Sequence, residues 1–140
     1  TMPPRLLVLD TNIVLDAFVF SDAAALPLRA GLRDGVLQWI ATPAMRIELA
    51  RVLGYKQIVP RLAFYGLGSQ DVLAAFDRHA QIVEAAPKAP VTCADADDQP
   101  FIDLAVAHRC ALLSKDRAVL DMRKRLLALG VVTAAALEAV

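Results

Sequence analysis

Four consecutive apolar residues at positions 6–9 run directly into Asp10, Thr11 and Asn12. An apolar run of this length that ends at turn-forming residues is typical of a strand buried on both faces, as at the centre of a parallel sheet. Asp10 would then lie at the carboxyl edge of the sheet, where open α/β folds bind their ligands. An acid at this position can also simply end the strand and cap the next helix, so Asp10 alone does not predict a site.

The rest of the chain alternates between short apolar runs and segments with helical periodicity. This alternation predicts an α/β fold, in which a mostly parallel sheet is covered on both faces. Since the chain has 140 residues and neither a repeat nor a linker, we expect one domain over residues 1–140. The expected strands are 6–9, 36–40, 81–84, 110–113 and 131–132; the expected helices are 13–20, 23–33, 43–53, 57–64, 70–79, 99–108, 117–129 and 134–139, the last capped by Thr133.

Composition narrows the possible functions only a little. The 15 Lys and Arg residues balance 15 Asp and Glu residues, so no global field attracts nucleic acid, although local patches can. No apolar stretch reaches the length of about 18 residues that a membrane span needs. Cys93 and Cys110 have neither metal-binding nor redox spacing, and we expect them to be buried thiols and not a disulfide. The N-terminus lacks a signal-peptide pattern, so a cytoplasmic protein is the expectation.

Several acids are expected at the same edge of the sheet. Asp10 and Asp116 follow predicted strands, a group of aspartates at 95–98 precedes a predicted helix, and Glu48 lies midway along another helix. Carboxylates gathered at one edge repel each other unless a cation joins them. Oxygen ligands without His or Cys suit Mg²⁺ or Mn²⁺, and such ions serve phosphodiester hydrolysis.

Each acid also has a plainer interpretation. Asp97 or Asp98 can be a helix N-cap, and Asp116 can be a turn acid that caps the next helix. Glu48 can pair with a nearby arginine, Arg46 or Arg51, on a solvated helix face. We expect Asp16, Asp22 and Asp71 to be surface or capping acids, Trp39 to lie in the core, and His79 and His108 to end helices without a catalytic partner.

Four segments, in order, resemble the motifs of PIN domains, and the resemblance covers nearly the whole chain. Residues 9–14 resemble the opening motif, Glu48 within 42–53 resembles the second acidic position, and residues 95–105 and 112–116 resemble the third and fourth motifs. Residues 51–56, Arg-Val-Leu-Gly-Tyr-Lys, are similar to the branch described as toxins of toxin–antitoxin pairs. The sequence departs from the family at Ser114-Lys115, where the family often has Thr and then Gly before the fourth acid.

The resemblance implies a three-layer α/β/α sandwich and a metal-dependent ribonuclease. Its acidic site would be Asp10, Glu48, Asp98 and Asp116, which would hold one or two Mg²⁺ or Mn²⁺ ions. We choose Asp98 because Phe101, Ile102 and Ala105 then fall at the family's apolar spacing. Asp95 would be a supporting ligand, Thr11 or Asn12 would orient Asp10 or a bound water, and Ser114 would replace the family's threonine.

The resemblance also implies an RNA substrate, a homodimer and an antitoxin protein that covers the site. Arg46, Lys115 and Arg117, with the basic run at 123–125, could contact an RNA backbone, although a solvated Lys115 is the plainer expectation. Two other classes stay open. One is a PIN-like binding module for nucleic acid or protein with little or no nuclease activity. The other is a response-regulator-like protein, which needs a pair of acids after the first strand that this chain lacks.

Overall fold

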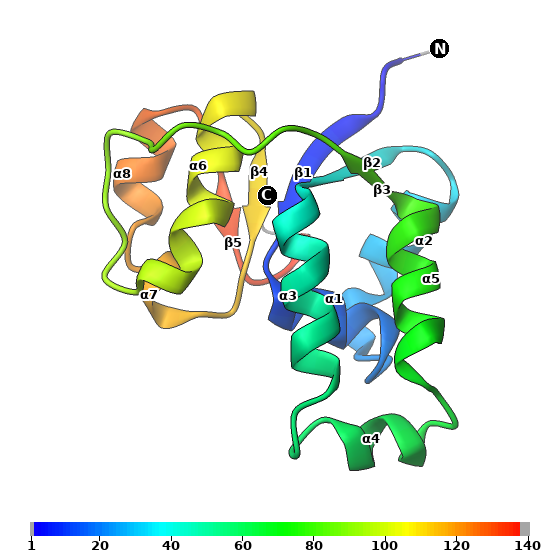
Figure 1. The fold of residues 1–140 in the computed structure, drawn as a ribbon. Helices are drawn as coiled ribbons and strands as arrows, with labels where there is room; N and C mark the ends of the chain where they lie inside the picture. Colours follow the sequence, from blue (N-terminus) through cyan, green and yellow to red (C-terminus); the bar gives the residue numbers. More distant parts are fainter. Residues whose placement is uncertain (1, 138–140) are drawn as a thin grey trace.

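The computed structural model describes residues 2–137, and these form a five-stranded parallel sheet (Figure 1). The strand order is β3-β2-β1-β4-β5, which puts the apolar run of the first strand at the centre, as its sequence predicts. The strands are β1 (Arg5–Leu9), β2 (Leu37–Ala41), β3 (Ala80–Ile82), β4 (Ala111–Leu113) and β5 (Thr133–Ala134).

Helices follow the strands in alternation. They are α1 (Thr11–Phe18), α2 (Leu26–Arg33), α3 (Pro43–Leu53), α4 (Val59–Phe64), α5 (Ser69–His79), α6 (Gln99–His108), α7 (Arg117–Leu120) and α8 (Arg123–Ala128), with short 3₁₀ turns η1 (Ala23–Ala25) and η2 (Ala96–Asp98). Within residues 2–137, none of these helices combines the length and apolar character that crossing a bilayer requires.

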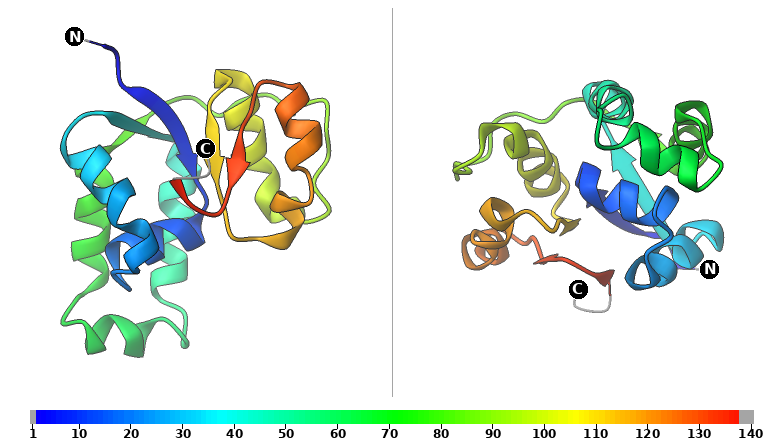
Figure 2. Two further views of the ribbon diagram at one scale, coloured as in Figure 1. Left: turned by 180° about the vertical axis from the view of Figure 1, so that it is seen from behind. Right: turned by 90° about the horizontal axis from the view of Figure 1, so that it is seen from below.

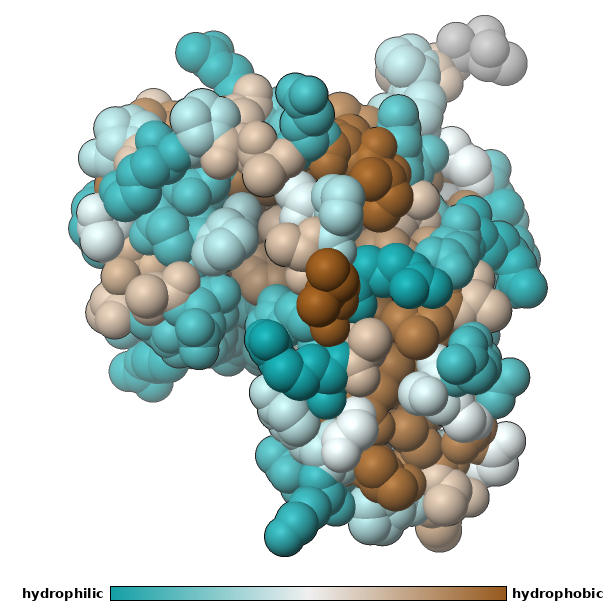
Figure 3. Space-filling model, in the orientation of Figure 1, coloured by the Kyte–Doolittle hydropathy of each residue, from teal (hydrophilic) through white to brown (hydrophobic). Residues whose placement is uncertain are grey.

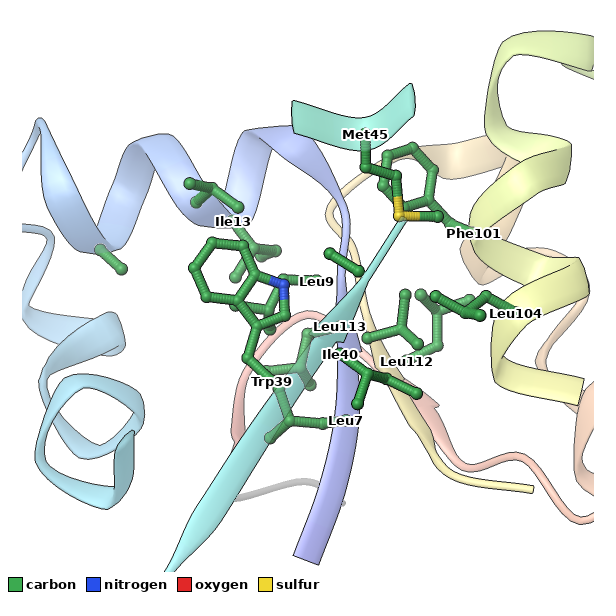
Figure 4. Close-up of a cluster of buried hydrophobic side chains, with 14 of the residues drawn as sticks. Leu7, Leu9, Ile13, Trp39, Ile40, Met45, Phe101, Leu104, Leu112 and Leu113 are labelled. Atoms are coloured by element: carbon green, nitrogen blue, oxygen red, sulfur yellow. The ribbon is translucent and has the colours of Figure 1, made fainter. Parts of the chain in front are cut away.

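Both faces of the sheet are covered. Trp39 lies on one face, where it stacks on Phe18 of α1 with 6.1 Å between ring centroids and meets Phe76 of α5 edge-on at 4.9 Å. Ile40 lies on the other face, on the side of Leu104 of α6 (Figure 4). Two further views of the molecule also show helices on both sides of the sheet (Figure 2). The predicted three-layer α/β/α sandwich and the buried Trp39 are therefore confirmed.

Helices α3 and α5 lie side by side and reach beyond the sheet, with α4 across their far ends (Figure 1). Helix α3 begins as its sequence predicts, because Thr42 accepts a hydrogen bond from the Met45 N–H at 3.3 Å and Pro43 occupies the first turn. Met45 reaches Phe101 at the start of α6 (Figure 4). The first turns of α3 and α6 are therefore neighbours at the carboxyl edge of the sheet.

The C-terminal part differs from the prediction. The expected helix at 134–139 with Thr133 as its cap is wrong at its start, because Thr133–Ala134 form β5; positions 138–139 lie outside the described residues. The backbone of β4 explains the change: its Leu112 N–H donates to Val132 O at 2.9 Å, so the last strand satisfies groups that would otherwise be buried without partners. The pairing lies two residues beyond the expected strand at 131–132.

The expected helix at 117–129 is divided into α7 and α8. Met122 has φ −93° and ψ 1°, which leaves the helical region and interrupts the ladder of hydrogen bonds between the two helices. Both cysteines, Cys93 and Cys110, are buried free thiols. The acids Asp22 and Asp71 cap η1 and α5 as expected: they accept hydrogen bonds from the Ala24 and Gly68 N–H groups.

Candidate functional site

The two central strands bring Asp10 and Ser114 together. Leu9 of β1 pairs with Leu113 of β4, so the residues that follow them are neighbours on one face of the sheet. The Ser114 hydroxyl donates to Asp10 Oδ2 at 2.6 Å, and the Asp116 N–H donates to the Ser114 hydroxyl at 3.0 Å. Ser114 thus connects the first and the fourth acidic motifs and performs the hydrogen bonding expected of the family's threonine.

The third motif brings two more carboxylates to this place. One carboxylate oxygen each from Asp95, Asp98 and Asp116 lies within 4.8 Å of the other two. Asp95 also accepts a hydrogen bond from the Asp97 N–H at 2.9 Å, which fixes the turn that leads into α6. Asp98 is 6% exposed, whereas its neighbour Asp97 is exposed. The acid selected from the apolar spacing is thus the one that points inward.

The electrostatics of this cluster favour a cation. Asp98 Oδ2 is buried and has no hydrogen-bond partner among residues 2–137. Burial, a proton shared with Asp116 and the charges of neighbouring carboxylates raise the pKa of Asp98 to about 8. Burial also raises the pKa of Asp10, against the hydrogen bond from Ser114. An oxygen that is desolvated, unpaired and surrounded by other carboxylates fits a divalent metal ion, which would replace the missing partner.

Glu48 approaches the cluster from α3. It is half-buried, and burial together with the charge of Asp10 raises its pKa, while the charge of Arg51 and the Thr11 hydroxyl oppose that rise. The Thr11 hydroxyl is directed at Glu48, and the expected role of Thr11 or Asn12 in orienting Asp10 or a bound water stays a prediction. The side-chain Oδ1 of Asn12 accepts a hydrogen bond from the backbone N–H of Lys115 at 3.4 Å. The orientation of Asp10 comes from Ser114.

Lys115 points away from the acid cluster. Its ammonium lies 2.6 Å from Asp16 Oδ2, and the two side chains are 47% and 11% exposed. The expectation that Asp16 is a surface or capping acid is wrong, because α1 begins at Thr11 and turns Asp16 inward, toward the residue after Ser114. The plainer expectation of a solvated Lys115 is also incomplete, since this lysine forms an ion pair.

Arg46 and Arg117, the other residues predicted to contact RNA, also have carboxylate partners. Arg46 donates two hydrogen bonds to Asp77 of α5, at 2.7 Å and 2.8 Å, and Arg117 lies 3.5 Å from Asp121. Their guanidinium groups are thus partly neutralised within the protein.

From its sequence position, Arg51 is expected only as a possible partner of Glu48. In the structure Arg51 is exposed and lines a cavity beside that glutamate, together with Ile47 and Pro100. The spacing within α3 could have identified Arg51 as a site residue. Positions 44, 47, 48 and 51 share one helix face, and Glu48 on that face is one of the predicted acidic site residues.

A comparison with known families agrees with the fold. The family described as PIN domain matches residues 6–118, which is most of the chain and includes all four acidic motifs. Among curated proteins, none matches the sequence at a significant level. The central parallel sheet, the acids at its carboxyl edge and the family match together show that this chain belongs to the PIN domain family.

Proposed function

We propose that this protein is a metal-dependent endoribonuclease that hydrolyses RNA phosphodiester bonds with Mg²⁺ or Mn²⁺. PIN domains are generally nucleases, and the family match covers the acidic motifs. The observation that carries the proposal is the convergence of Asp95, Asp98 and Asp116 within 4.8 Å, with one buried oxygen of Asp98 left without a partner among the residues that the structure describes. Asp10, which follows β1, and Glu48 of α3 would complete the acidic set.

The donor set supports a hard cation. Carboxylate oxygens without histidine suit Mg²⁺ and Mn²⁺ better than zinc. Cys93 lies near these acids, but its thiol is directed at the Ala118 carbonyl oxygen at 3.7 Å. Burial raises the pKa of this thiol, which disfavours the thiolate that a softer metal would need. Asp10, Asp98 and Asp116 would hold the metal, with Glu48 and Asp95 beside them.

When bound, the metal ion supplies activation of a water molecule and neutralises charge on the phosphate. The protein's own residues set the positions. Ser114 holds Asp10 in one orientation through a 2.6 Å hydrogen bond. Asp116 is fixed through its Oδ1, which accepts from the Ala118 N–H at 2.9 Å. The burial of Asp98 excludes water from its carboxylate, which strengthens its attraction for a cation.

We further propose that the protein is the toxin of a type II toxin–antitoxin pair that acts in the cytoplasm, that it forms a homodimer, and that an antitoxin protein covers the acidic site. The support for the toxin assignment is the motif at residues 51–56. The support for a dimer is the exposed apolar surface of α4, where Phe64 is 82% and Val59 is 49% exposed. The toxin assignment predicts growth arrest on induced expression, and Asp10→Asn should relieve it. Light scattering of the purified protein would test the homodimer.

The nuclease itself is tested with purified protein and a labelled single-stranded RNA, in Mn²⁺ and in chelator. We expect cleavage in Mn²⁺ and none in chelator. Asp10→Asn keeps the size of the side chain but removes the charge, and we expect it to reduce cleavage at least about 100-fold while the protein stays folded. Asp34→Asn, which changes an exposed acid at the end of α2, is the matched control and should cleave like the parent.

Two results would contradict this function. If Asp10→Asn cleaves as fast as the parent, the activity does not come from this site. If the parent binds RNA but cleaves none, and Mn²⁺ gives no saturable rise in melting temperature, the protein is a PIN-like binding module without nuclease activity.

A further inference from the structure

A cavity of about 350 Å³ lies between α3 and the segment that leads into α6. Its walls are Ala44, Ile47 and Arg51 on one side and Ala96, Asp97 and Pro100 on the other. Figure 3 shows the surface hollowed between the part that holds α6 and the part that holds α3. Cavities of this size, from roughly 300 Å³ upward, hold small organic ligands or parts of larger ones.

The cavity adjoins the acidic site. Glu48 belongs to both, because it lines the cavity and is close enough to Asp10 for the two charges to interact. Asp97 lines the cavity and directly precedes Asp98. The cavity is therefore next to the acids that would face a scissile phosphate.

The walls are apolar at one place, cationic at another, and acidic on the side of the metal site, where Glu48 and Asp97 lie. Ile47 is 66% exposed, and Ala44 and Pro100 continue the apolar wall beside it. Water around an exposed isoleucine of this size is released when a flat apolar surface covers it. Figure 3 shows a hydrophobic area over α3 that hydrophilic residues surround. This combination fits a planar base more closely than a second protein surface.

Arg51 supplies the positive charge. It is exposed, and among residues 2–137 no carboxylate lies within salt-bridge distance of its guanidinium group. Arg46, one turn earlier on α3, differs because Asp77 takes two of its hydrogen bonds. A guanidinium group without such a partner can make two parallel hydrogen bonds to a phosphate.

We propose that this cavity, a groove between α3 and α6, binds the nucleotide next to the scissile phosphate of the RNA, with its base against Ile47 and Pro100 and its phosphate at Arg51. The inference rests on the proposed ribonuclease function and names residues that bind its substrate.

The test is steady-state cleavage of one RNA in Mn²⁺. Ile47→Ala and Arg51→Gln should each raise KM by about 5–30-fold, with kcat changed less than about twofold, because they remove binding that is the same in the ground and transition states. Ile47→Trp should lower KM by about 3–10-fold, since a base stacks on an indole. Val36→Ala, an equally exposed aliphatic residue before β2, is the control and should leave both constants unchanged.

The outcomes separate this inference from the proposed function. If the parent cleaves RNA, yet Ile47→Ala and Arg51→Gln keep its KM, the groove does not bind the substrate and only this inference is overturned. Should those two variants instead alter the dimer dissociation constant and not KM, the groove binds a second copy of the chain. If the parent cleaves nothing, the proposed function has failed, and the groove inference fails with it.

Discussion

Asp10 and Asp16 are both buried aspartates, 5% and 8% exposed, but their surroundings differ. Asp16 has the Lys115 ammonium 2.6 Å away, so a positive charge replaces the water that it lost. Asp10 has a neutral partner, the Ser114 hydroxyl at 2.6 Å, and other carboxylates beyond it. A buried acid with its own cation is a structural element, whereas a cluster of buried acids that lacks a cation is a candidate site for an external one.

The short segment after β4 serves both regions. Ser114 and Asp116 turn toward the acid cluster, and Lys115 between them turns toward α1. The cause is the alternation of side chains in extended backbone. One tripeptide therefore contributes to a candidate metal site on one side and to a structural ion pair on the other, and the two roles can be separated by substitution.

The largest expected difference between the two regions is in catalysis. Asp98→Asn should reduce RNA cleavage in Mn²⁺ at least about 100-fold, because it removes a charge from the cluster. Asp16→Asn should keep the rate within about threefold of the parent's, which is less than about 1 kcal/mol in the barrier. Initial rates on one labelled RNA measure both. Equal losses in the two variants would remove the distinction between structural and functional acids.

The second difference is in stabilisation by metal. At a Mn²⁺ concentration of about 100 times the dissociation constant, binding adds about 2.7 kcal/mol to the stability of a protein with one site. The parent and Asp16→Asn should both gain about this amount, while Asp98→Asn should lose most of it. Melting curves with and without Mn²⁺ give the comparison. A full gain in Asp98→Asn would mean that the ion binds elsewhere.

The third prediction concerns pH in the absence of metal. The pKa of Asp98 is raised from 3.8 to about 8 in the folded protein. Below the lower value both the folded and the unfolded state hold the proton, so this group has no effect on stability. Between the two values only the unfolded state releases the proton, so the free energy of unfolding falls as pH rises, and it levels off above about 8.

Asp98→Asn removes this proton linkage. In chelator at pH 8 we expect the variant to be more stable than the parent by several kcal/mol, since one pKa unit corresponds to about 1.4 kcal/mol, and its stability should depend less on pH between 4 and 8. Urea denaturation at several pH values measures this. A variant with the same pH dependence as the parent would show that Asp98 is not the group that keeps the proton.

The smallest expected effect is the loss of stability when the Asp16–Lys115 pair is broken. The loss should be larger when Lys115 is replaced than when Asp16 is replaced. Lys115→Met leaves the carboxylate of Asp16, which is only 11% exposed, without a cation, and should cost about 1–2 kcal/mol. Asp16→Asn leaves Lys115, which is 47% exposed and can turn into solvent, and should cost less than about 1 kcal/mol. Denaturation of both variants and of the double variant measures the coupling. A larger cost for Asp16→Asn would show that this carboxylate has a further role.

Some of these features could be predicted from local sequence. The apolar run before Asp10 indicated the central strand, and the Thr42-Pro43 pair indicated the start of α3, because buried strands and capped helices have local signals. Asp98 could be distinguished from Asp97 by the apolar spacing that comes after it. The two-residue strand β5 could not be predicted, because its pairing depends on the backbone of β4, and neither could the burial of Asp16.

The sequence by itself determined the family and the alternation of strands and helices as far as β4, since periodicity, turn residues and motif spacing are properties of neighbouring residues. Only the tertiary structure decided which acid has a cation and which does not. Lys115 lies next to Asp116 in the chain, yet it neutralises Asp16, and Arg46 pairs with Asp77 while Arg51 stays exposed beside Glu48. Such pairings depend on which side chains the packing of distant elements places within a few ångströms, because the electrostatic energy of a pair depends on distance and burial and not on separation along the chain.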